Sequence, residues 1–566
     1  MSLRDRRIVA RFIALLAVFA ILAVACSDDD DGKTPTTTAG ATGGVPSGGE
    51  IAFGLEQEPD CLDWLGSCAT VAYGFWSGNV TTIPRAFSVE KDGDTFKYVP
   101  TSLLVGEPEL DQSGAKPQVT YEINPKAVWS DGEPITSSDF KYVWEQVTGG
   151  GDINDTTGYD KIEGVDDSKP ATAVVTFKEP YADWRSLFGS TYGVLPSHLL
   201  EGKDRSAEMA NGYTWSGGPW KIESWNKGES LTLIPNDGYW GPKPKLDKVI
   251  FRFIPDTPSE FKAFKDGEVD GIYPQPSIEI VDEITAAGIP DANAEYTAET
   301  ANTEALWINT EKPPLDDVNV RRALAYSIDR DAIVNRLFGK IGVKRALQDA
   351  TPPILKAYGE PTAFAKYKLD LDKVTDLMTD AGWKKGSDGF WAKGGQKASL
   401  EMFSTAGNKT RELVLQVVQT QLKEAGFDAS ITLLTPRELF PGHILPGDYN
   451  LLLLSRRVAG FYPESCSLFC SKNIPTVEND LSGQNIDRVN DPKVDAAYLA
   501  GETEMDTAKA QSLNKQGNRI LADKVYFLPL DPLPAILLTS SKVVGSVEDN
   551  PVMGPFWKMW GWGIKK

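Results

Sequence analysis

The sequence predicts a large α/β protein built from helix-then-strand units in two or three lobes. The chain has 566 residues, of which 41% are hydrophobic and 24% are charged. This length exceeds the size at which a single hydrophobic core stops growing, so more than one lobe is expected. From about residue 49 onward, short β-type runs alternate with helical runs, which indicates mixed sheets with helices on their faces.

Two segments show clear hydrophobic periodicity, one of a strand and one of a helix. VIFRFIP, at residues 249–255, alternates apolar and polar side chains as a half-buried strand does. VNVRRALAYSID, at residues 318–329, carries an apolar stripe at helical spacing. Asp329 is placed to end this helix and to cap a second one, which runs to a glycine stop.

Three further segments share one local pattern, a helical run that ends in Ala-Gly and an apolar residue. They are EITAAGI at 283–289, LMTDAGW at 377–383 and QLKEAGF at 421–427. The glycine supplies a left-handed conformation at the helix end, and the apolar residue then packs back on the helix. Strand patterns follow the second and third segments, which again predicts helix-strand units.

The N-terminal 48 residues have the pattern of an export signal and a tether. Residues 12–25 are an uninterrupted apolar run behind a basic start, too short to cross a bilayer. Ala23-Val24-Ala25-Cys26 resembles a bacterial lipobox, so we expect a signal peptide at 1–25 and lipid on Cys26; plain secretion is the alternative. Residues 26–48, rich in Gly, Thr and Pro, predict a flexible tether. We therefore expect an exported protein, lipid-anchored to the outer face of the bacterial cytoplasmic membrane.

Four of the five cysteines remain after Cys26, namely Cys61, Cys68, Cys466 and Cys470. An exported chain meets an oxidising compartment, which favours disulfides. The sequence-local pairs 61/68 and 466/470 are the simplest of three connectivities. A four-cysteine zinc site is the alternative, although these spacings fit zinc poorly.

Composition and motifs argue against several classes of function. The formal net charge is −21 at pH 7, whereas nucleic acid and anionic lipid are bound through clustered Lys and Arg. The chain has two histidines, His198 and His443, and no HExxH, GxSxG, GxGxxG or complete phosphate loop. A glycosidase needs only two carboxylates, which sequence cannot place, so that alternative stays open.

Several longer segments, in order along the chain, carry a family resemblance. In the first of them, Thr136 to Asp139 can cap a helix whose buried stripe is Phe140, Val143 and Trp144. The segments are WSDGEPITSSDFKYVWE (129–145), SGGPWKIESWNKGESLTLIPNDGYWG (216–241), FKAFKDGEVDGIY (261–273), ALWINTEKPPLDDVNVRRALAYSIDRDAIV (305–334), NDPKVDAAYLAG (490–501) and FLPLDPLPAILLTSS (527–541). They resemble the family 5 extracellular solute-binding proteins, the oligopeptide, dipeptide and nickel-chelate receptors of ABC importers.

The resemblance implies a fold like that of type II periplasmic binding proteins, with two hinged lobes and an extra subdomain. Lobe I is expected at about 49–80, 216–305 and 530–566, the inserted subdomain at about 81–215, and lobe II at about 306–529. Such a protein closes over a solute at the lobe interface and delivers it to a membrane permease. It is expected to be a monomer, without catalysis and without a cofactor or metal.

The segment LLLLSRRVAGFYPES, at 451–465, departs from the family pattern. Peptide-binding members carry an aspartate here that pairs with the ligand's amino group. This chain lacks that aspartate, and the first acidic residue after Arg457 is Glu464. An ammonium enclosed without a counter-charge costs roughly several kcal/mol, so a standard peptide mode is in doubt. Arg456 or Arg457 is instead placed to face an anionic or polar ligand, and alternation along a strand allows at most one of them to do so. Structural ion pairs are the alternative.

Aromatic side chains supply the remaining candidates for ligand contact. Phe461 and Tyr462 follow the two arginines, and the second cysteine pair is expected to stiffen their loop. Tyr73, Phe75, Trp76 and Trp215 are candidate cleft walls, with core packing as the alternative. Gly74 and Ser77 favour a loop for the first cluster. The missing aspartate is also compatible with non-transport relatives that act in cell-envelope glycolipid synthesis or regulation, the alternative function.

Overall fold

The computed structural model describes residues 44–566 except 67, 69–71, 93–94, 191, 287, 299, 459–462 and 464. Residues 45–566 form one compact unit. The predicted signal peptide, Cys26 and nearly all of the tether lie outside the described residues. Within the described part, no helix combines the length and apolarity that a bilayer crossing requires.

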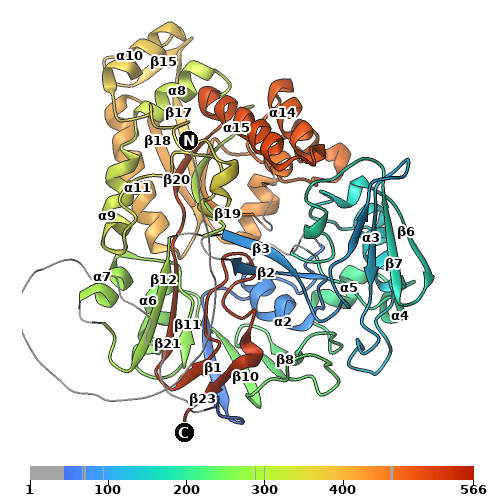
Figure 1. Cartoon of the computed structure of the whole chain (residues 1–566). Helices are drawn as coiled ribbons and strands as arrows, with labels where there is room; N and C mark the ends of the chain where they lie inside the picture. Colours follow the sequence, from blue (N-terminus) through green and yellow to red (C-terminus); the bar gives the residue numbers. More distant parts are fainter. Residues whose placement is uncertain are drawn as a thin grey trace, which may run out of the picture. The chain divides into compact units, whose positions relative to one another are not determined.

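The first large sheet has seven strands in the order β12-β21-β11-β1-β10-β9-β8 (Figure 1). Its strands are β1 (Glu50–Leu55), β8 (Trp220–Asn226), β9 (Ser230–Pro235), β10 (Lys248–Phe253), β11 (Gly271–Ile272), β12 (Ala292–Thr297) and β21 (Ala535–Ser540). Strand β1 runs parallel to β10 and β11, whereas β21 is antiparallel to its neighbours. Helix α6 (Thr257–Lys265) packs on β1 and β11 of this sheet, and helix α7 (Ile278–Ala286) connects β11 to β12. We call this part lobe I.

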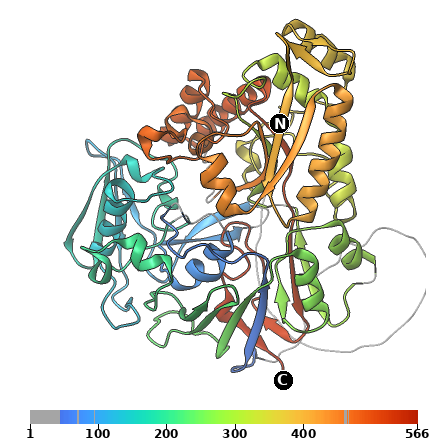
Figure 2. The ribbon, with the colours of Figure 1, turned by 180° about the vertical axis from the view of Figure 1, so that it is seen from behind.

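The second large sheet has five strands in the order β18-β17-β19-β13-β20. They are β13 (Asn302–Ile308), β17 (Ser399–Thr405), β18 (Asp428–Leu434), β19 (Leu451–Arg457) and β20 (Phe527–Asp531). Its helices are α8 (Val318–Tyr326), α9 (Arg330–Phe338), α10 (Leu371–Asp380), α11 (Lys409–Ala425), α12 (Pro436–Leu439), α13 (Ser465–Phe469), α14 (Pro492–Thr503) and α15 (Thr507–Lys524). Figure 2 shows α14 and α15 packed side by side. A small sheet of β14 (Lys384–Lys385), β15 (Trp391–Lys393) and β16 (Gln396–Lys397) completes this part, which we call lobe II.

The chain between β1 and β8 forms an insertion with its own sheet, β4-β5-β7-β6, and a hairpin, β2-β3. The strands are β2 (Phe87–Asp92), β3 (Thr95–Pro100), β4 (Glu109–Asp111), β5 (Gln118–Glu122), β6 (Ile162–Lys169) and β7 (Thr172–Phe177). Helices α1 (Ala72–Gly74), α2 (Val80–Thr82), α3 (Ser137–Gly149), α4 (Ser197–Leu200) and α5 (Arg205–Ala210) lie in the same stretch. The insertion shares one hydrophobic core with lobe I, and lobe II centres on another, which also takes in side chains of α6, α7, β11 and β21 of lobe I. Strands β22 (Val543–Gly545) and β23 (Trp562–Ile564) pair near the C-terminus.

Most local predictions are confirmed. Strand β10 buries the alternating face that includes Val249 and Phe251, and α8 buries its predicted stripe. Asp329 caps α9 by accepting the backbone N–H of Ala332 at 3.0 Å. The Ala-Gly-apolar segments each place glycine at positive φ, +71° at Gly288, +82° at Gly382 and +99° at Gly426.

The insertion also begins its main helix as predicted. The Thr136 backbone N–H donates to the Asp139 carboxylate at 2.9 Å, which forms a capping box at the start of α3. The same carboxylate oxygen accepts from the indole of Trp129 at 3.2 Å, so the cap also fixes the preceding turn. Phe140 and Val143 are fully buried, whereas Trp144 is half-buried.

Two adjacent crossings connect lobe I to lobe II. The chain passes from β12 to β13 through residues 298–301 and returns from β20 to β21 through residues 532–534. Strands β12 and β21 pair in one sheet, and β13 and β20 pair in the other, so the crossings run side by side. Thr300 joins them by donating its hydroxyl to the Pro532 carbonyl. The predicted lobe boundaries at 305/306 and 529/530 fall inside β13 and β20.

Phe53 anchors the core of lobe I, and its removal is expected to destabilise the protein strongly. Its ring lies 4.8 Å from that of Phe556 and 6.1 Å from that of Trp562, and it is 1% exposed. Phe53→Ala should lower the free energy of unfolding by about 3–5 kcal/mol, because a large cavity is left behind. Val105→Ala, at a side chain that is 68% exposed, is the control and should cost less than about 0.5 kcal/mol. Denaturant unfolding measures both, and equal losses would contradict the assignment.

Candidate functional site: a cavity between the two large sheets

The described residues enclose a cavity of about 730 Å³ whose walls come from lobe I, lobe II and the insertion. Lobe I contributes Tyr273 and Gln275. The start of the insertion, directly after β1, contributes Gln57, Trp64, Tyr73 and Trp76, and its later part contributes residues 150–156 and Tyr192. Lobe II contributes Asn302, Thr405, Arg411, Phe440, Ser455, Arg456, Ser467 and residues 479–484. This volume lies in the range of small-molecule sites. A molecule that fills this cavity contacts lobe I, the insertion and lobe II.

The wall on the lobe I side is aromatic. The rings of Tyr73 and Trp76 are 5.3 Å apart, and Trp76 is in turn 5.3 Å from Tyr273. The Tyr73 hydroxyl donates to the Tyr273 carbonyl at 2.9 Å. Burial, with Glu56 and Glu260 adding to it, raises the pKa of Tyr73 well above its ordinary value, so this hydroxyl stays neutral.

The residues around Tyr73 are helical, which corrects the predicted loop and separates the candidate side chains. Tyr73 and Trp76 share a face three residues apart and both line the cavity. Phe75 points elsewhere, where the Arg85 guanidinium lies 4.8 Å from its ring centre. Phe75 is not part of the cavity lining.

Trp215 also lies off the cavity lining. Its ring stacks on that of Tyr213 at 4.2 Å and meets Trp129 edge-on at 5.7 Å. Because Trp215 and Phe75 pack against other side chains of the protein and lie off the cavity lining, we leave both out of the proposed ligand contacts.

Strand β19 ends at the cavity, as the four buried leucines before Arg456 predict. Arg456 is half-buried and lines the cavity, where its guanidinium donates to the backbone carbonyl of Gln484 at 2.9 Å and to its side-chain oxygen at 2.6 Å. Gln484 in turn donates to Asn154 of the insertion at 3.1 Å. The side chain of Arg457 and the residues Phe461, Tyr462 and Glu464 lie outside what the structure describes.

Both predicted disulfide pairs are present in the structure. Cys61 is bonded to Cys68, and Cys466 to Cys470, with Cα atoms 5.9 Å and 4.6 Å apart. The four sulfurs are therefore not free to bind zinc. Among the described residues, no group of three or more His, Cys, Asp or Glu side chains is arranged to hold a metal ion.

The second disulfide closes the short helix α13, whose Ser467 reaches the insertion. Its hydroxyl donates to the Asp155 carboxylate at 2.9 Å. Nearby, Lys472 pairs with Asp160 at 3.2 Å. Together with the Gln484–Asn154 contact, these bonds join lobe II to the insertion along the rim of the cavity.

A buried ion pair fixes the insertion loop that forms this rim. Arg205 donates to the Asp63 carboxylate at 2.7 Å, and both side chains are at most 1% exposed. The same guanidinium donates to the carbonyls of Gly151 at 3.1 Å and Asp152 at 2.9 Å. Burial raises the pKa of Asp63 to about 6, and Arg205 opposes that rise.

Sequence reasoning missed one charged group on the lobe II wall. Arg411, in the first turn of α11, donates to both carboxylate oxygens of Glu304 at 2.7 and 3.0 Å, and to the Thr405 hydroxyl at 3.0 Å. Glu304 lies on β13, more than one hundred residues earlier, so no local pattern links the two. The polar, glycine-rich run at 148–158 is the sequence feature that indicates the loop at the rim of the cavity.

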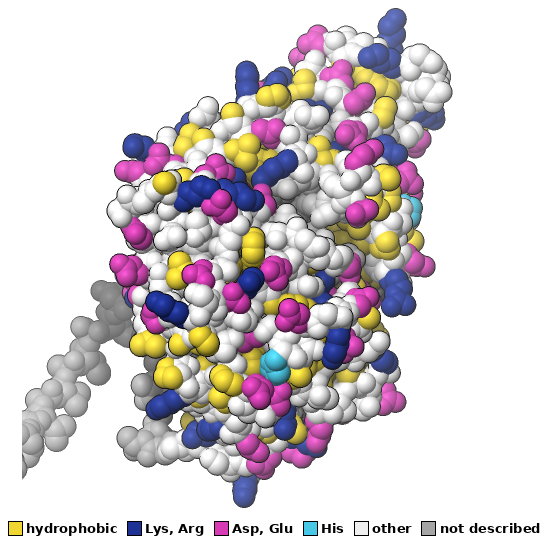
Figure 3. Space-filling view, turned by 90° about the vertical axis from the view of Figure 1, so that its right-hand side faces the viewer, with side chains coloured by type: hydrophobic (Ala, Val, Ile, Leu, Met, Phe, Trp, Pro, Cys, Tyr) yellow, Lys and Arg dark blue, Asp and Glu magenta, His cyan; other side chains and the backbone are white. Residues whose placement is uncertain are grey.

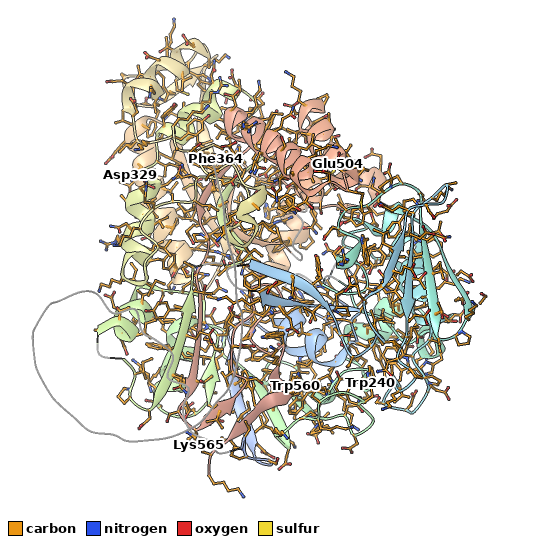
Figure 4. The ribbon with its side chains drawn as sticks, viewed as in Figure 1. Trp240, Asp329, Phe364, Glu504, Trp560 and Lys565 are labelled. Carbon is orange, nitrogen blue, oxygen red and sulfur yellow. A yellow bond between two sulfur atoms is a disulfide. The ribbon has the colours of Figure 1, made fainter. Side chains whose placement is uncertain are left out.

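Two residues of the family-like segments serve packing. The indole of Trp240 donates to the Ser102 carbonyl at 2.8 Å and so joins lobe I to the insertion, while Asp329 caps α9 (Figure 4). On the face shown in Figure 3, acidic and basic side chains are interspersed. That face offers no extended basic stripe of the kind that binds nucleic acid.

Breaking the Asp63–Arg205 pair is expected to loosen the rim loop and to destabilise the fold in a pH-dependent way. In Arg205→Met the buried Asp63 carboxylate has no cation, which costs roughly 3–5 kcal/mol when it is ionised. Because the folded-state pKa of Asp63 is already raised, the stability of the folded form is lost as pH rises through that value. The variant should therefore lose more melting temperature than the wild type between pH 5 and pH 8. Arg519→Met, which breaks a pair whose arginine is 60% exposed, is the control; a pH profile of Arg205→Met equal to that of this control would contradict the account.

Comparison with known proteins places this arrangement in a family. The family model for bacterial extracellular solute-binding proteins, family 5 (middle region), matches residues 107–471. Protein XP55 of Streptomyces lividans is 26% identical over 515 residues, which is 87% of this chain and 86% of that protein.

Two solved structures show the same fold over nearly the whole chain. The periplasmic EDTA-binding protein EppA superposes with a TM-score of 0.79 at 23% identity, covering 93% of this chain and 98% of that one. The oligopeptide-binding protein AppA of Bacillus subtilis, in complex with a nonapeptide, gives a TM-score of 0.80 at 19% identity, covering 92% and 100%. With its two lobes of mixed sheets and helices, the chain belongs to the bacterial extracellular solute-binding proteins, family 5.

Proposed function

We propose that this protein is the substrate-binding lipoprotein of an ABC importer, which captures a peptide-like or other polar or anionic small solute and delivers it to a membrane permease. The observation that supports this most is the cavity itself, because its walls come from both lobes and the insertion. The protein acts as a monomer in the cell envelope, held to the membrane through lipid on Cys26. It carries out no bond chemistry.

Capture works through lobe closure. A solute that touches both lobes stabilises the closed form by its differential affinity for that form over the open one. The two adjacent crossings at 298–301 and 532–534 are the places where the backbone can bend while each sheet stays intact. The closed form then docks on the permease.

Arg456 is the residue we propose to orient the solute. It lines the cavity at the end of a rigid buried strand, and its planar guanidinium matches a carboxylate or phosphate. Its hydrogen bonds to Gln484 hold the guanidinium group in position before the ligand binds. Phe461, Tyr462 and Glu464, which follow in the same segment, together with Tyr73 and Trp76, complete the proposed contact set.

The solute class is open to a direct test. The test is a thermal-shift screen of a panel of candidate compounds. Because EppA is an EDTA-binding protein and the AppA structure contains a nonapeptide, this panel should include short peptides, polycarboxylate chelates and their metal complexes. A glycolipid headgroup belongs in it too, because the role in envelope glycolipid synthesis stays a prediction. We expect at least one compound to raise the melting temperature. A panel that leaves the melting temperature unchanged throughout would contradict the proposal.

Replacement of Arg456 tests its role with the compound so found. Arg456→Ala should weaken binding by about 10- to 100-fold, since a charge-assisted bond to a carboxylate is worth roughly 1.5–3 kcal/mol. Arg322→Ala removes a lobe II arginine that pairs with Asp523 away from the cavity and should leave affinity unchanged. Isothermal titration calorimetry measures both, and equal affinities in the two variants would remove Arg456 from the site.

A further inference from the structure

Five ionisable side chains from both lobes meet beside the crossings. On lobe II, Glu304 of β13 lies in register opposite Asp531 of β20, and Arg411 of α11 is bonded to Glu304 at 2.7 Å. On lobe I, Glu56 directly follows β1, and Glu260 lies on α6. All four carboxyl groups are at most 6% exposed.

Glu260 packs against β1, and Glu56 follows the end of that strand. A Cβ atom on Gly54 would lie 3.1 Å from Cγ of Glu260, so this glycine makes room for the glutamate. Glu56 lies two residues after Gly54, in the bend that follows β1, and its charge acts on Glu260. It accepts the backbone N–H of Gln275 at 3.1 Å, whereas neither carboxyl oxygen of Glu260 has a hydrogen-bond partner among the described residues.

The charges around this pair favour its protonated form. Burial raises the pKa of Glu56 to about 7, with Asp256 adding to the rise and Thr257, Gln275 and Arg411 opposing it. Burial, Glu56 and Asp256 together raise the pKa of Glu260 well above its ordinary value. Burial, Glu56 and Glu260 raise the pKa of Tyr73, so this side chain is neutral and brings no positive charge to the pair.

Arg411 cannot neutralise all of these groups. It already makes two bonds to Glu304, and burial together with Glu304 raises the pKa of the adjacent Asp531 well above its ordinary value. One cation therefore faces carboxyl groups from both lobes. Since several buried carboxylates around one guanidinium are strongly unfavourable, at least part of the cluster must hold protons near neutral pH.

The environment of Glu56 depends on contact between the lobes. Arg411 and Thr410 belong to the first turn of α11 in lobe II, and the Thr410 hydroxyl donates to the Pro276 carbonyl of lobe I at 2.9 Å. Pro276 follows Gln275, whose N–H is bonded to Glu56. Separation of the lobes would move the start of α11, with Arg411, off this surface and would open Glu56 to water; of these two influences on the pKa of Glu56, burial is the larger.

We propose that the Glu56–Glu260 pair binds a proton that stabilises the closed arrangement of the two lobes, so that closure takes up a proton and opening releases it. The inference goes beyond capture of a solute, because it concerns the lobes alone. A carboxyl group whose pKa is raised in one form favours that form at low pH. The closed form should therefore be most populated near pH 5 and should lose population as pH rises through about 7.

Energy transfer between two dyes on the solute-free full chain in detergent micelles tests this directly. The dyes are placed through non-natural residues at Asp237 of lobe I and Lys384 of lobe II, both exposed. In the wild type we expect the two dyes to move apart between pH 5.5 and pH 8. In Glu56→Gln and Glu260→Gln, which mimic the protonated group, this pH-dependent separation should shrink to less than about half.

Asp349→Asn is the matched control. Asp349 is a buried lobe II carboxyl whose pKa is also raised, to about 6, yet it bonds to Asn518 and is absent from the cavity lining. This variant should keep the wild-type separation. A wild type whose dyes do not move, or glutamine variants that behave as Asp349→Asn does, would overturn the proposal.

Infrared difference spectra report protonated carboxyl groups directly, and the wild-type spectrum alone already tests whether a carboxyl group titrates in this interval. We expect loss of protonated carboxyl signal between pH 5.5 and pH 8, and a smaller loss in Glu56→Gln. If the wild-type spectrum shows no carboxyl titrating in this interval, the proton site does not exist. Because neither measurement contains a solute, either result leaves the proposed import function to be judged by its own panel.

Discussion

Arg411 of lobe II faces carboxyl groups of both lobes beside the crossings. Its bidentate bonds to Glu304 hold the start of α11 against β13, and Thr410, beside it, reaches the backbone of lobe I. The cavity wall on this side therefore depends on a single ion pair placed where the two sheets join. A guanidinium suits this position because its five donors satisfy several acceptors from one rigid plane.

The opposite rim depends on a different kind of contact. There the insertion meets lobe II through short polar bonds, Ser467 to Asp155 and Gln484 to Asn154, and the buried Asp63–Arg205 pair anchors the loop from behind. Bonds of this type are each worth about 1 kcal/mol, so they can form and break as the lobes move. The molecule thus combines the bidentate Arg411–Glu304 ion pair beside the crossings with weaker polar contacts at the rim of the cavity.

The sequence predicted well those features that depend on local spacing. The strand at 249–255, the helix after residue 318 and the three glycine ends follow from period and backbone conformation. Tyr73, Phe75 and Trp76 are neighbours in sequence, which predicts one cluster, yet a helical turn sends Phe75 to another side. The carboxyl groups around Arg411 and the Asp63–Arg205 pair join residues far apart in the chain, so only the tertiary fold brings them together.

The central claim is that the space between the two sheets holds a solute, and native mass spectrometry of protein purified from its own cells under non-denaturing conditions tests it most directly. The account predicts a mass above that of the protein alone by a small molecule, which dissociates at low collision energy and is absent from the Arg456→Ala protein. A bare protein mass in repeated preparations, with no species gained on incubation with extracts of the growth medium, would contradict it.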